Sequence, residues 1–340
     1  MGARILVSRY ADVAACLRHP ALSSAIASDG ILRRQLDLMD PPRHTQLRQI
    51  LAKAFDRSLL EQVAAVAERW IAERLAALPH RFDVIAEIAK PLPLVVVGEV
   101  LGLPPEDRGV FERGVSAFVD VVANGGPVDD ASVDALRLVV GNALARTDLV
   151  AGTVLALVRE ASPDVIELDD VVANAVLIMA AGHQTTTNLI GNGLWLLLAH
   201  PDQRALLDRR PDGWALAIEE ILRFESPVQS VRRVAAQAFV VGDRAIAAGD
   251  ELALLLGTAN RDPDAFADPN RFDVHRTPNR HLAFGGGAHL CLGAHVARVQ
   301  AAAALKSLCA LPSLRLVDRE PAWAASTAYR GLERLIVEWT

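Results

Sequence analysis

One cysteine of the chain stands where the sequence could hold a reactive thiolate. Cys291 follows a run of glycines, Gly285 to Gly287, and comes just before Gly293 and an alanine-rich, helix-forming segment. The amides of a first helical turn have no partner inside the helix, and they lie at the positive end of its dipole. Glycines carry no Cβ, so the backbone can approach a bulky, flat group. The layout indicates a thiolate near the beginning of a helix, with room beside it for a ligand.

The same stretch admits other interpretations. His281, His289, Cys291 and His295 are potential zinc ligands, although their spacing is irregular. The glycine run could belong to a phosphate-binding loop, but no Lys-Ser or Lys-Thr pair follows it. A lone cysteine is by default a small core residue. None of these alternatives explains the motifs described next.

A histidine and an arginine form a second candidate site near the front of the chain. His44 and Arg48 are four residues apart in a segment that opens with Asp40 and two prolines, which is typical of the beginning of a helix with Asp40 as its cap. On a helix the two side chains share one face, where they could bind a pair of carboxylates. The alternative is a solvated helix face.

The longest apolar run, residues 169–199, is interrupted by six polar residues, His183 to Asn188. Polar side chains are costly in hydrocarbon, so the run predicts a central helix of a large core and not a membrane span. Ala181 and Gly182 would let a ligand approach the backbone, and the helix could open locally there. The alternative is that the threonines only bond the preceding helical turn.

Helices and strands must position these residues. Helical periodicity predicts helices over residues 10–18, 58–78, 105–122, 129–146 and 169–199, and over 82–101 with a kink or break at Pro91 and Pro93. Residues 4–8 form a short strand-like run, and the runs at 227–235, 239–241 and 251–256 predict a small antiparallel sheet.

In this order, the motifs resemble those of the cytochrome P450 monooxygenases. Phe284, Gly287, His289, Cys291 and Gly293 are similar to the family signature Phe-x-x-Gly-x-His-x-Cys-x-Gly. The resemblance implies a mainly α fold with a small antiparallel β portion, and haem b between the long central helix and the helix after the cysteine loop. It implies that the Cys291 thiolate is the axial iron ligand, which favours O–O bond cleavage.

The resemblance extends over essentially the whole chain and implies a single domain, residues 1–340. Family members usually carry a further helix and strand before the segment equivalent to Ile5. We expect their absence to affect the folding of the edge sheet. The last segment resembles the family's final hairpin, whose turn, near Ser326 to Tyr329, would reach the substrate pocket.

The resemblance also implies roles for individual residues. Those expected to bind the haem propionates are His44, Arg48, Arg233 and His289. Those expected to contact the haem from the loop are Phe284, Gly285 and Gly293. Those expected to form a structural brace behind the cysteine loop are Glu220, Arg223 and Arg271.

Ala181, Gly182, Thr185 and Thr186 match the family's oxygen-activation motif, Ala-Gly-x-acid-Thr-Thr, from which the chain departs at one position. Gln184 stands where the family usually has Asp or Glu. An amide can orient hydrogen bonds but cannot carry a proton at neutral pH as a carboxylate does. Thr185 would still be available to hold oxygen and a water chain.

Composition narrows the class of protein. The chain has 340 residues and a formal net charge of −6, which gives no general attraction for nucleic acid or anionic membranes. Its three cysteines are widely spaced, which indicates neither a disulfide framework nor a zinc ribbon. The first residues form neither a signal peptide nor a membrane anchor. We therefore expect a soluble, cytoplasmic monomer.

These observations predict a haem-thiolate monooxygenase that hydroxylates or otherwise oxidises a small, mostly apolar organic substrate in secondary metabolism. No flavin or nicotinamide segment is recognisable, so the resemblance implies a ferredoxin and a ferredoxin reductase as electron donors. Candidate docking charges are Lys53, Arg57, Arg280 and Arg298. An alternative, supported by Gln184 and by the short front, is a haem-binding protein without turnover that acts as a sensor or as a partner in a complex.

Overall fold

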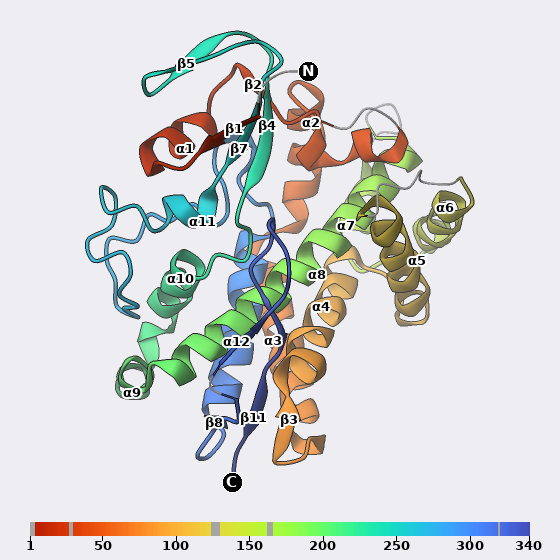
Figure 1. The fold of residues 1–340 in the computed structure, drawn as a ribbon. Coiled ribbons are helices and arrows are strands. Elements are labelled where there is room, and N and C mark those ends of the chain that lie inside the picture. The colour runs from red at the N-terminus through yellow and green to blue at the C-terminus, as the bar shows by residue number, and fades with distance from the viewer. Residues whose placement is uncertain (1–3, 27–29, 124–129, 162–165, 319) are drawn as a thin grey trace. The chain divides into compact units, whose positions relative to one another are not determined.

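The computed structural model describes residues 4–26, 30–123, 130–161, 166–318 and 320–340. The chain forms two compact units, which are described separately (Figure 1). Residues 1–23, 66–92 and 185–340 make up the first, here called the sheet unit because it holds all the described strands. Residues 24–65 and 93–184 make up the second, here called the helical unit.

The largest sheet of the sheet unit has the strand order β1-β7-β4-β2. Its strands are β1 (Arg4–Val7), β2 (Leu22–Ser23), β4 (Val231–Ala235) and β7 (Glu251–Leu254). The predicted antiparallel pairing is confirmed for β4 with β7, but β1 pairs with β7 in parallel. This sheet, where the short front is expected to have its effect, is four-stranded and mixed, with β1 at its edge.

Smaller sheets complete the β portion. They consist of the hairpin β5 (Phe239–Val241) with β6 (Arg244–Ile246), the pair β9 (Ala322–Trp323) with β10 (Leu332–Arg334), and the three strands β3 (Arg81–Asp83), β11 (Ile336–Glu338) and β8 (Arg315–Leu316). The predicted final hairpin is thus confirmed. Its turn is held where Gln229 donates its backbone N–H to the Ala328 carbonyl at 2.8 Å.

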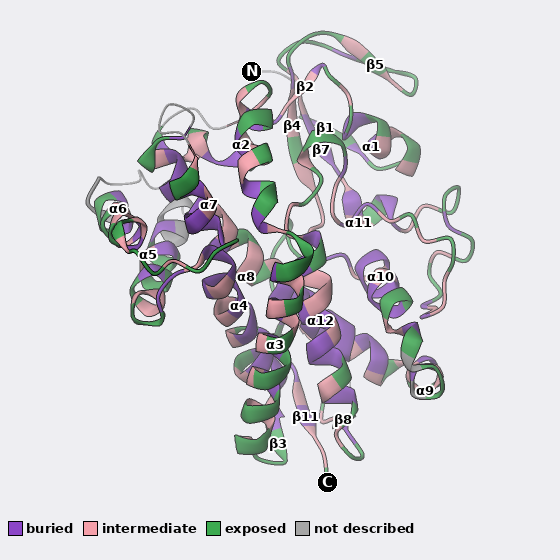
Figure 2. Ribbon diagram, turned by 180° about the vertical axis from the view of Figure 1, so that it is seen from behind, coloured by how far each residue is buried: buried purple, intermediate pink, exposed green. Residues whose placement is uncertain are grey.

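The helices that lie entirely in the sheet unit surround these strands. They are α1 (Tyr10–Cys16), the π-helical turn η4 (Ile85–Ala89), α9 (Pro201–Arg209), the 3₁₀ turn η5 (Pro211–Gly213), α10 (Trp214–Phe224), α11 (Leu256–Ala259), the 3₁₀ turn η6 (Gly287–His289) and α12 (Ala294–Cys309). One hydrophobic core joins β1, α1, β7 and α11 through residues such as Ile5, Val13, Leu252 and Leu256. Leu282 belongs to this core, and α12 buries residues along its whole length (Figure 2). The segment before the cysteine loop is therefore anchored in packed interior.

The helical unit holds the predicted front site. Its helices are η1 (Gly30–Arg34), η2 (Leu36–Leu38), α2 (Arg43–Leu51), η3 (Ala52–Ala54), α5 (Pro105–Ala123), α6 (Asp130–Ala145) and α7 (Val154–Glu160). Asp170, whose side chain is 3% exposed, accepts bonds from Arg34 and Arg43. Asn174 accepts the backbone N–H of Leu36 at 2.9 Å. These bonds fix residues 34–43 onto the first turns of α8.

Three helices contribute residues to both units: α3 (Arg57–Ala77), α4 (Pro91–Leu101) and α8 (Leu168–Ala199). The break predicted at Pro91 is confirmed, because α4 begins at that proline, which has no N–H to donate to a preceding helix. The turn before it, η4, is π-helical, with Lys90 donating its N–H to the Ile85 carbonyl at 3.0 Å. Helix α8 is unbroken along its 32 residues, so the local opening predicted at Ala181 and Gly182 is not observed.

Candidate functional site

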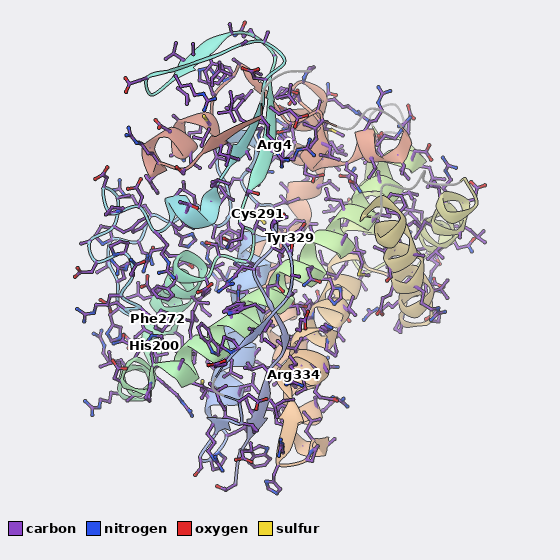
Figure 3. All side chains as sticks on the ribbon, viewed as in Figure 1. Arg4, His200, Phe272, Cys291, Tyr329 and Arg334 are labelled. Carbon is purple, nitrogen blue, oxygen red and sulfur yellow. The ribbon has the colours of Figure 1, made fainter. Side chains whose placement is uncertain are left out.

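The cysteine loop is built from short backbone hydrogen bonds. Gly285 donates its N–H to the Leu282 carbonyl at 2.8 Å, and Cys291 donates its N–H to the Phe284 carbonyl at 3.0 Å. Helix α12 then begins at Ala294 with Gly293 as its N-cap, two residues after the cysteine. Cys291, which is labelled in Figure 3, is exposed, while Cys16 and Cys309 are buried. The loop therefore presents its thiol outward from an ordered backbone, at the beginning of a helix as predicted.

A glycine of the loop is required by a close approach to α1. Gly287 has a φ of +67°, a region that L side chains rarely adopt, and a Cβ there would lie 2.4 Å from the Leu17 carbonyl oxygen. Gly285 also has a positive φ, of +70°, but a Cβ there would meet only the His289 carbonyl oxygen, at 3.9 Å. Packing against Leu17 thus requires a glycine at position 287. At Gly285, the nearest atom that a Cβ would meet is 3.9 Å away, so the loop backbone is open on that side.

Side chains from two other segments, together with His281 itself, fix the residues just before the loop. Asn260 accepts the backbone N–H of Leu282 at 2.7 Å through its Oδ1. His281 accepts the N–H of Ala283 at its Nδ1, at 3.2 Å, and its Nε2 lies 3.0 Å from the Glu219 carboxylate. Because Nδ1 acts as the acceptor, Nε2 carries the proton and donates it to Glu219.

The brace behind the loop is present, with one correction to its membership. Glu220 and Arg223 on α10 are completely buried and share two hydrogen bonds of 2.8 Å. The third guanidinium is that of Arg276, whose Nε lies 3.2 and 3.1 Å from the two Glu220 oxygens. The prediction that Arg271 joins the pair is wrong, because its side chain is exposed and only its carbonyl oxygen accepts bonds, from Arg223 and Arg276.

The polar stretch of α8, from His183 to Asn188, is divided between the two units after Gln184. In the sheet unit, Thr185 is half-buried, and Thr186 and Thr187 are buried. Thr187 donates its hydroxyl to the Ala89 carbonyl at 3.0 Å, so this threonine bonds to η4 and not to the preceding turn of its own helix. Its role in the structure is to join α8 to η4.

The rest of the predicted oxygen motif belongs to the helical unit. Ala181 and Gln184 are exposed, although the turns of α8 before them, from Val171 to Val176, are buried. A Cβ on Gly182 would lie 3.0 Å from a methyl group of Val97. Gly182 therefore makes room for α4. This packing role is separate from the functional role predicted for Gly182.

His44 and Arg48 lie on α2 as predicted, also in the helical unit. Burial and the neighbouring Arg48 lower the pKa of His44 below its ordinary value, and Asp40 opposes them. The lowered pKa favours the neutral ring, whose N–H could donate a hydrogen bond to a carboxylate. Asp40 is not the helix cap, which is Pro42; its carboxylate instead accepts the N–H of Ser24 at 3.0 Å.

The remaining predicted propionate ligands, Arg233 and His289, lie in the sheet unit. Arg233 is half-buried on β4 and donates to the Arg232 carbonyl at 2.7 Å. His289 is half-buried in η6. The predicted set is therefore divided between the two units, and its assembly at one haem stays a prediction.

The alternative of a zinc site finds no support in the described residues. They contain no cluster of three or more His, Cys, Asp or Glu side chains placed to hold a metal ion. His281 is occupied with Glu219 and Ala283. None of the described helices combines the length and apolar character that crossing a membrane requires.

Residues that sequence reasoning missed at this site are Glu219, Asn260 and Arg276. Each acts on a partner more than twenty residues away, which a single sequence does not reveal. A weak signal was nonetheless present, since Glu219 directly precedes Glu220 and Arg276 is five residues beyond Arg271 in the same Pro- and Asp-rich loop.

The chain is similar to known proteins along nearly its whole length. Residues 215–310 match the family model described as Cytochrome P450. "Cytochrome P450 monooxygenase PikC" from Streptomyces venezuelae is 36% identical over 322 residues, 88% of this chain and 74% of that protein. "Mycinamicin VIII C21 methyl hydroxylase" from Micromonospora griseorubida is 35% identical over 98% of this chain and 90% of that protein. The solved structure of CalO2 has a TM-score of 0.91 and 32% identity, covering 98% of this chain and 90% of that one. With its cysteine loop, α10 brace and helical fold, the chain belongs to the cytochrome P450 family.

Proposed function

We propose that this cytochrome P450 monooxygenase binds haem b through the Cys291 thiolate and hydroxylates, or otherwise oxidises, a small, mostly apolar substrate of secondary metabolism. The observation that carries the proposal is the cysteine loop. Of the chain's three cysteines, all within the described residues, Cys291 is the one exposed, and its backbone is fixed by the bond to Phe284.

The residues present fit a haem. Leu290, beside the exposed cysteine, is itself 48% exposed, so an apolar side chain is available next to the thiol. The open backbone at Gly285 would let a flat group approach the loop without meeting a Cβ. Thiolate sulfur is a soft ligand suited to iron, and thiolate ligation is one of the established ways in which proteins hold haem iron.

When bound, haem supplies the reductive activation of O2, for which thiolate donation favours O–O bond cleavage. The chain's own residues bind and orient it. Arg48 and Arg233 offer guanidinium forks that suit carboxylates, and His44, whose lowered pKa favours the neutral ring, offers a ring N–H. His289 is the fourth proposed propionate partner, from the cysteine loop itself.

On the oxygen side we assign two residues of α8. The Thr185 hydroxyl can both donate and accept, so its Oγ1 can hold a water in place for proton delivery. The Gln184 amide can orient that water but has no proton to exchange at neutral pH. Proton delivery in this chain would therefore depend on water more than it does where a carboxylate occupies this position.

Bacterial cytochromes P450 take electrons from separate redox partners, and we propose a ferredoxin with its reductase for this chain. Among the candidate docking charges, Arg298 is half-buried in a bidentate pair with Glu219. Arg57 pairs with Glu61 at 2.8 Å, but its side chain is 92% exposed. Lys53, Arg57 and Arg280 are exposed and stay as docking candidates.

The substrate proposal rests on the relatives. One relative is named for hydroxylating a methyl group of mycinamicin VIII, and another is the monooxygenase PikC. Hydroxylation of an apolar carbon in a compound of this kind is the reaction that we propose. We also propose that the chain acts as a monomer and that residues 1–340 form one cytochrome P450 domain.

The test is the spectrum of the reduced carbon monoxide complex. Wild-type protein should show the red-shifted Soret band of thiolate-ligated haem, and Cys291→Ser should abolish it. The matched control is Cys309→Ala, a change at a buried cysteine, which should keep the band. If Cys291→Ser keeps the band, the assignment is wrong. Substrate oxidation driven by NADPH through a ferredoxin and its reductase, or by peroxide, would exclude a haem-binding protein without turnover.

A further inference from the structure

We propose that Glu219 is a positioning residue for the cysteine loop: its carboxylate holds Arg298 and His281, and through them Phe284 and the backbone that carries Cys291. The inference rests on the proposed role of Cys291 as the iron ligand. It gives a purpose to a carboxylate that neither the brace nor the haem contacts described above use.

Glu219 lies at the centre of three segments of the sheet unit. It stands on α10 and accepts two hydrogen bonds from Arg298 on α12, at 2.6 Å from Nε and 2.7 Å from Nη2. His281, which is 4% exposed, donates its Nε2–H to the same carboxylate at 3.0 Å. The Glu219 and Arg298 side chains are 25% and 30% exposed, so the pair is largely shielded from water. Charge-assisted, bidentate bonds of this kind are among the stronger side-chain contacts.

One arm of the network acts on the backbone before the loop. His281 bonds the N–H of Ala283 through Nδ1, which requires its proton to be on Nε2. Glu219 accepts the hydrogen bond from this Nε2–H and thereby fixes the tautomer and the orientation of the ring. Without the carboxylate, the ring could rotate or change tautomer and release the Ala283 N–H.

The other arm acts on the loop itself. The guanidinium carbon of Arg298 lies 4.5 Å from the centroid of the Phe284 ring, a cation–π contact. The carbonyl of Phe284 is the group that accepts the Cys291 N–H at 3.0 Å. The residue whose ring is held by Arg298 is therefore the residue that fixes the cysteine backbone.

Glu219 and Glu220 are adjacent but have different partners. Successive residues of a helix point about 100° apart, so two neighbouring carboxylates face two neighbouring segments. Glu220 binds Arg223 and Arg276, and it also accepts a bond at 3.2 Å from the side-chain amide of Asn279, which precedes His281 by two residues. Glu219 binds His281 and Arg298, which contact Ala283 and Phe284 directly. Loss of Glu219 should therefore loosen the loop within a folded protein.

The experiment measures how long thiolate ligation lasts. The reduced carbon monoxide complex is prepared from haem-loaded wild-type protein and from Glu219→Gln, and conversion of the thiolate-type Soret band to the shorter-wavelength band is followed at a temperature where circular dichroism shows both proteins folded. We expect conversion about five to ten times faster in Glu219→Gln, because losing a charge-assisted pair makes local opening of the loop more frequent. Glu219→Asp, which keeps the charge, should recover part of the difference.

The matched control is Glu251→Gln, which removes a carboxylate from the exposed Arg232–Glu251 pair of the same unit. It should convert at the wild-type rate. If Glu219→Gln does not fold, Arg298→Lys is the second variant, since it keeps the cation but loses the fork and should also convert faster. Wild-type conversion rates in the folded Glu219 variant, or an equal increase in Glu251→Gln, would overturn the inference. A wild-type protein that never shows the thiolate band would overturn the proposed function, and this inference with it.

Discussion

Replacing Arg276 and Arg271 separately by alanine would test how the brace is built. Sequence motifs favour Arg271 as the partner of Glu220 and Arg223, whereas the structure has the Arg276 side chain in that place. Arg276→Ala should therefore destabilise the protein strongly, and Arg271→Ala should change little. The two positions are five residues apart in one loop, so each variant is a matched control for the other.

The expected magnitude follows from the bonds that each variant removes. The Arg276 side chain is 11% exposed, and its Nε contacts both oxygens of Glu220, a fully buried carboxylate. Breaking a buried pair by removing one partner costs about 3–5 kcal/mol when the other charge is left alone. Glu220 is not left alone here, because it keeps both bonds from Arg223 and the N–H of Asp273 at 2.9 Å. We therefore expect a loss of about 2–3 kcal/mol, below this range, because Glu220 keeps these other bonds.

The guanidinium of Arg276 also holds the loop backbone. It donates to the carbonyls of Ala267, Asp268 and Arg271 at 2.7, 3.2 and 3.1 Å. Arg271→Ala removes an exposed side chain and leaves the Arg271 carbonyl in place, so its effect should stay within about 0.5 kcal/mol.

The assay is urea unfolding of the haem-loaded proteins, followed by far-UV circular dichroism and by the Soret band. The midpoint should fall for Arg276→Ala and should barely move for Arg271→Ala, with similar slopes for all three proteins. An equal loss in both variants, or a larger loss for Arg271→Ala, would show that the side-chain assignment is wrong.

Further predictions concern three other residues. Gln184→Glu should raise the fraction of consumed oxygen that appears as product, because a carboxylate can deliver protons; an unchanged fraction would show that the amide is not the limit. Gly287→Ala should lower the free energy of unfolding by about 2 kcal/mol or more, because its φ is +67° and its Cβ would lie 2.4 Å from the Leu17 oxygen; a neutral effect in urea unfolding would contradict this close approach. Burial raises the pKa of Glu219, but bonds from Arg298 and His281 outweigh it and lower this pKa from 4.5 to about 2, so the ionised carboxylate stabilises the fold by up to about 3 kcal/mol. Relative to Glu219→Gln, this advantage should be constant above pH 5 and shrink by about 1.4 kcal/mol per pH unit as the pH falls below 4.5; an advantage that persists unchanged to pH 3 would refute it.

Sequence reasoning succeeded where the physical signal is local. The break at Pro91 follows from a missing N–H, and the α12 beginning after Gly293 follows from a glycine-to-alanine change in composition. Cys291 was identifiable because the glycines and the following helix are adjacent to it. For these features, the neighbouring residues determine the conformation.

Sequence reasoning failed where the partner is distant. The pairing of β1 with β7 was not predicted, because it joins residues as far apart as Arg4 and Glu251, and a strand's own sequence states neither its neighbour nor that neighbour's direction. The choice between Arg271 and Arg276 depends on how one Pro- and Asp-rich loop folds around a carboxylate more than fifty residues earlier. Both arginines have the right chemistry, and only the loop backbone decides between them.

The adjacency of Glu219 and Glu220 joins these two lessons. In a helix, two successive side chains point about 100° apart. One turn of α10 can therefore bind both Arg276, through Glu220, and Arg298, through Glu219. The two carboxylates are not equivalent: Glu220 is fully buried, whereas Glu219 keeps a quarter of its side chain exposed. A buried carboxylate with two guanidinium partners tolerates no movement without large cost, while a partly exposed one can exchange a partner for water. Loss of Glu220 should therefore unfold the loop and the helix together. Loss of Glu219 should lower the free energy of unfolding and should also leave the thiolate held less firmly in the folded protein, and only the spectrum reports on the second effect.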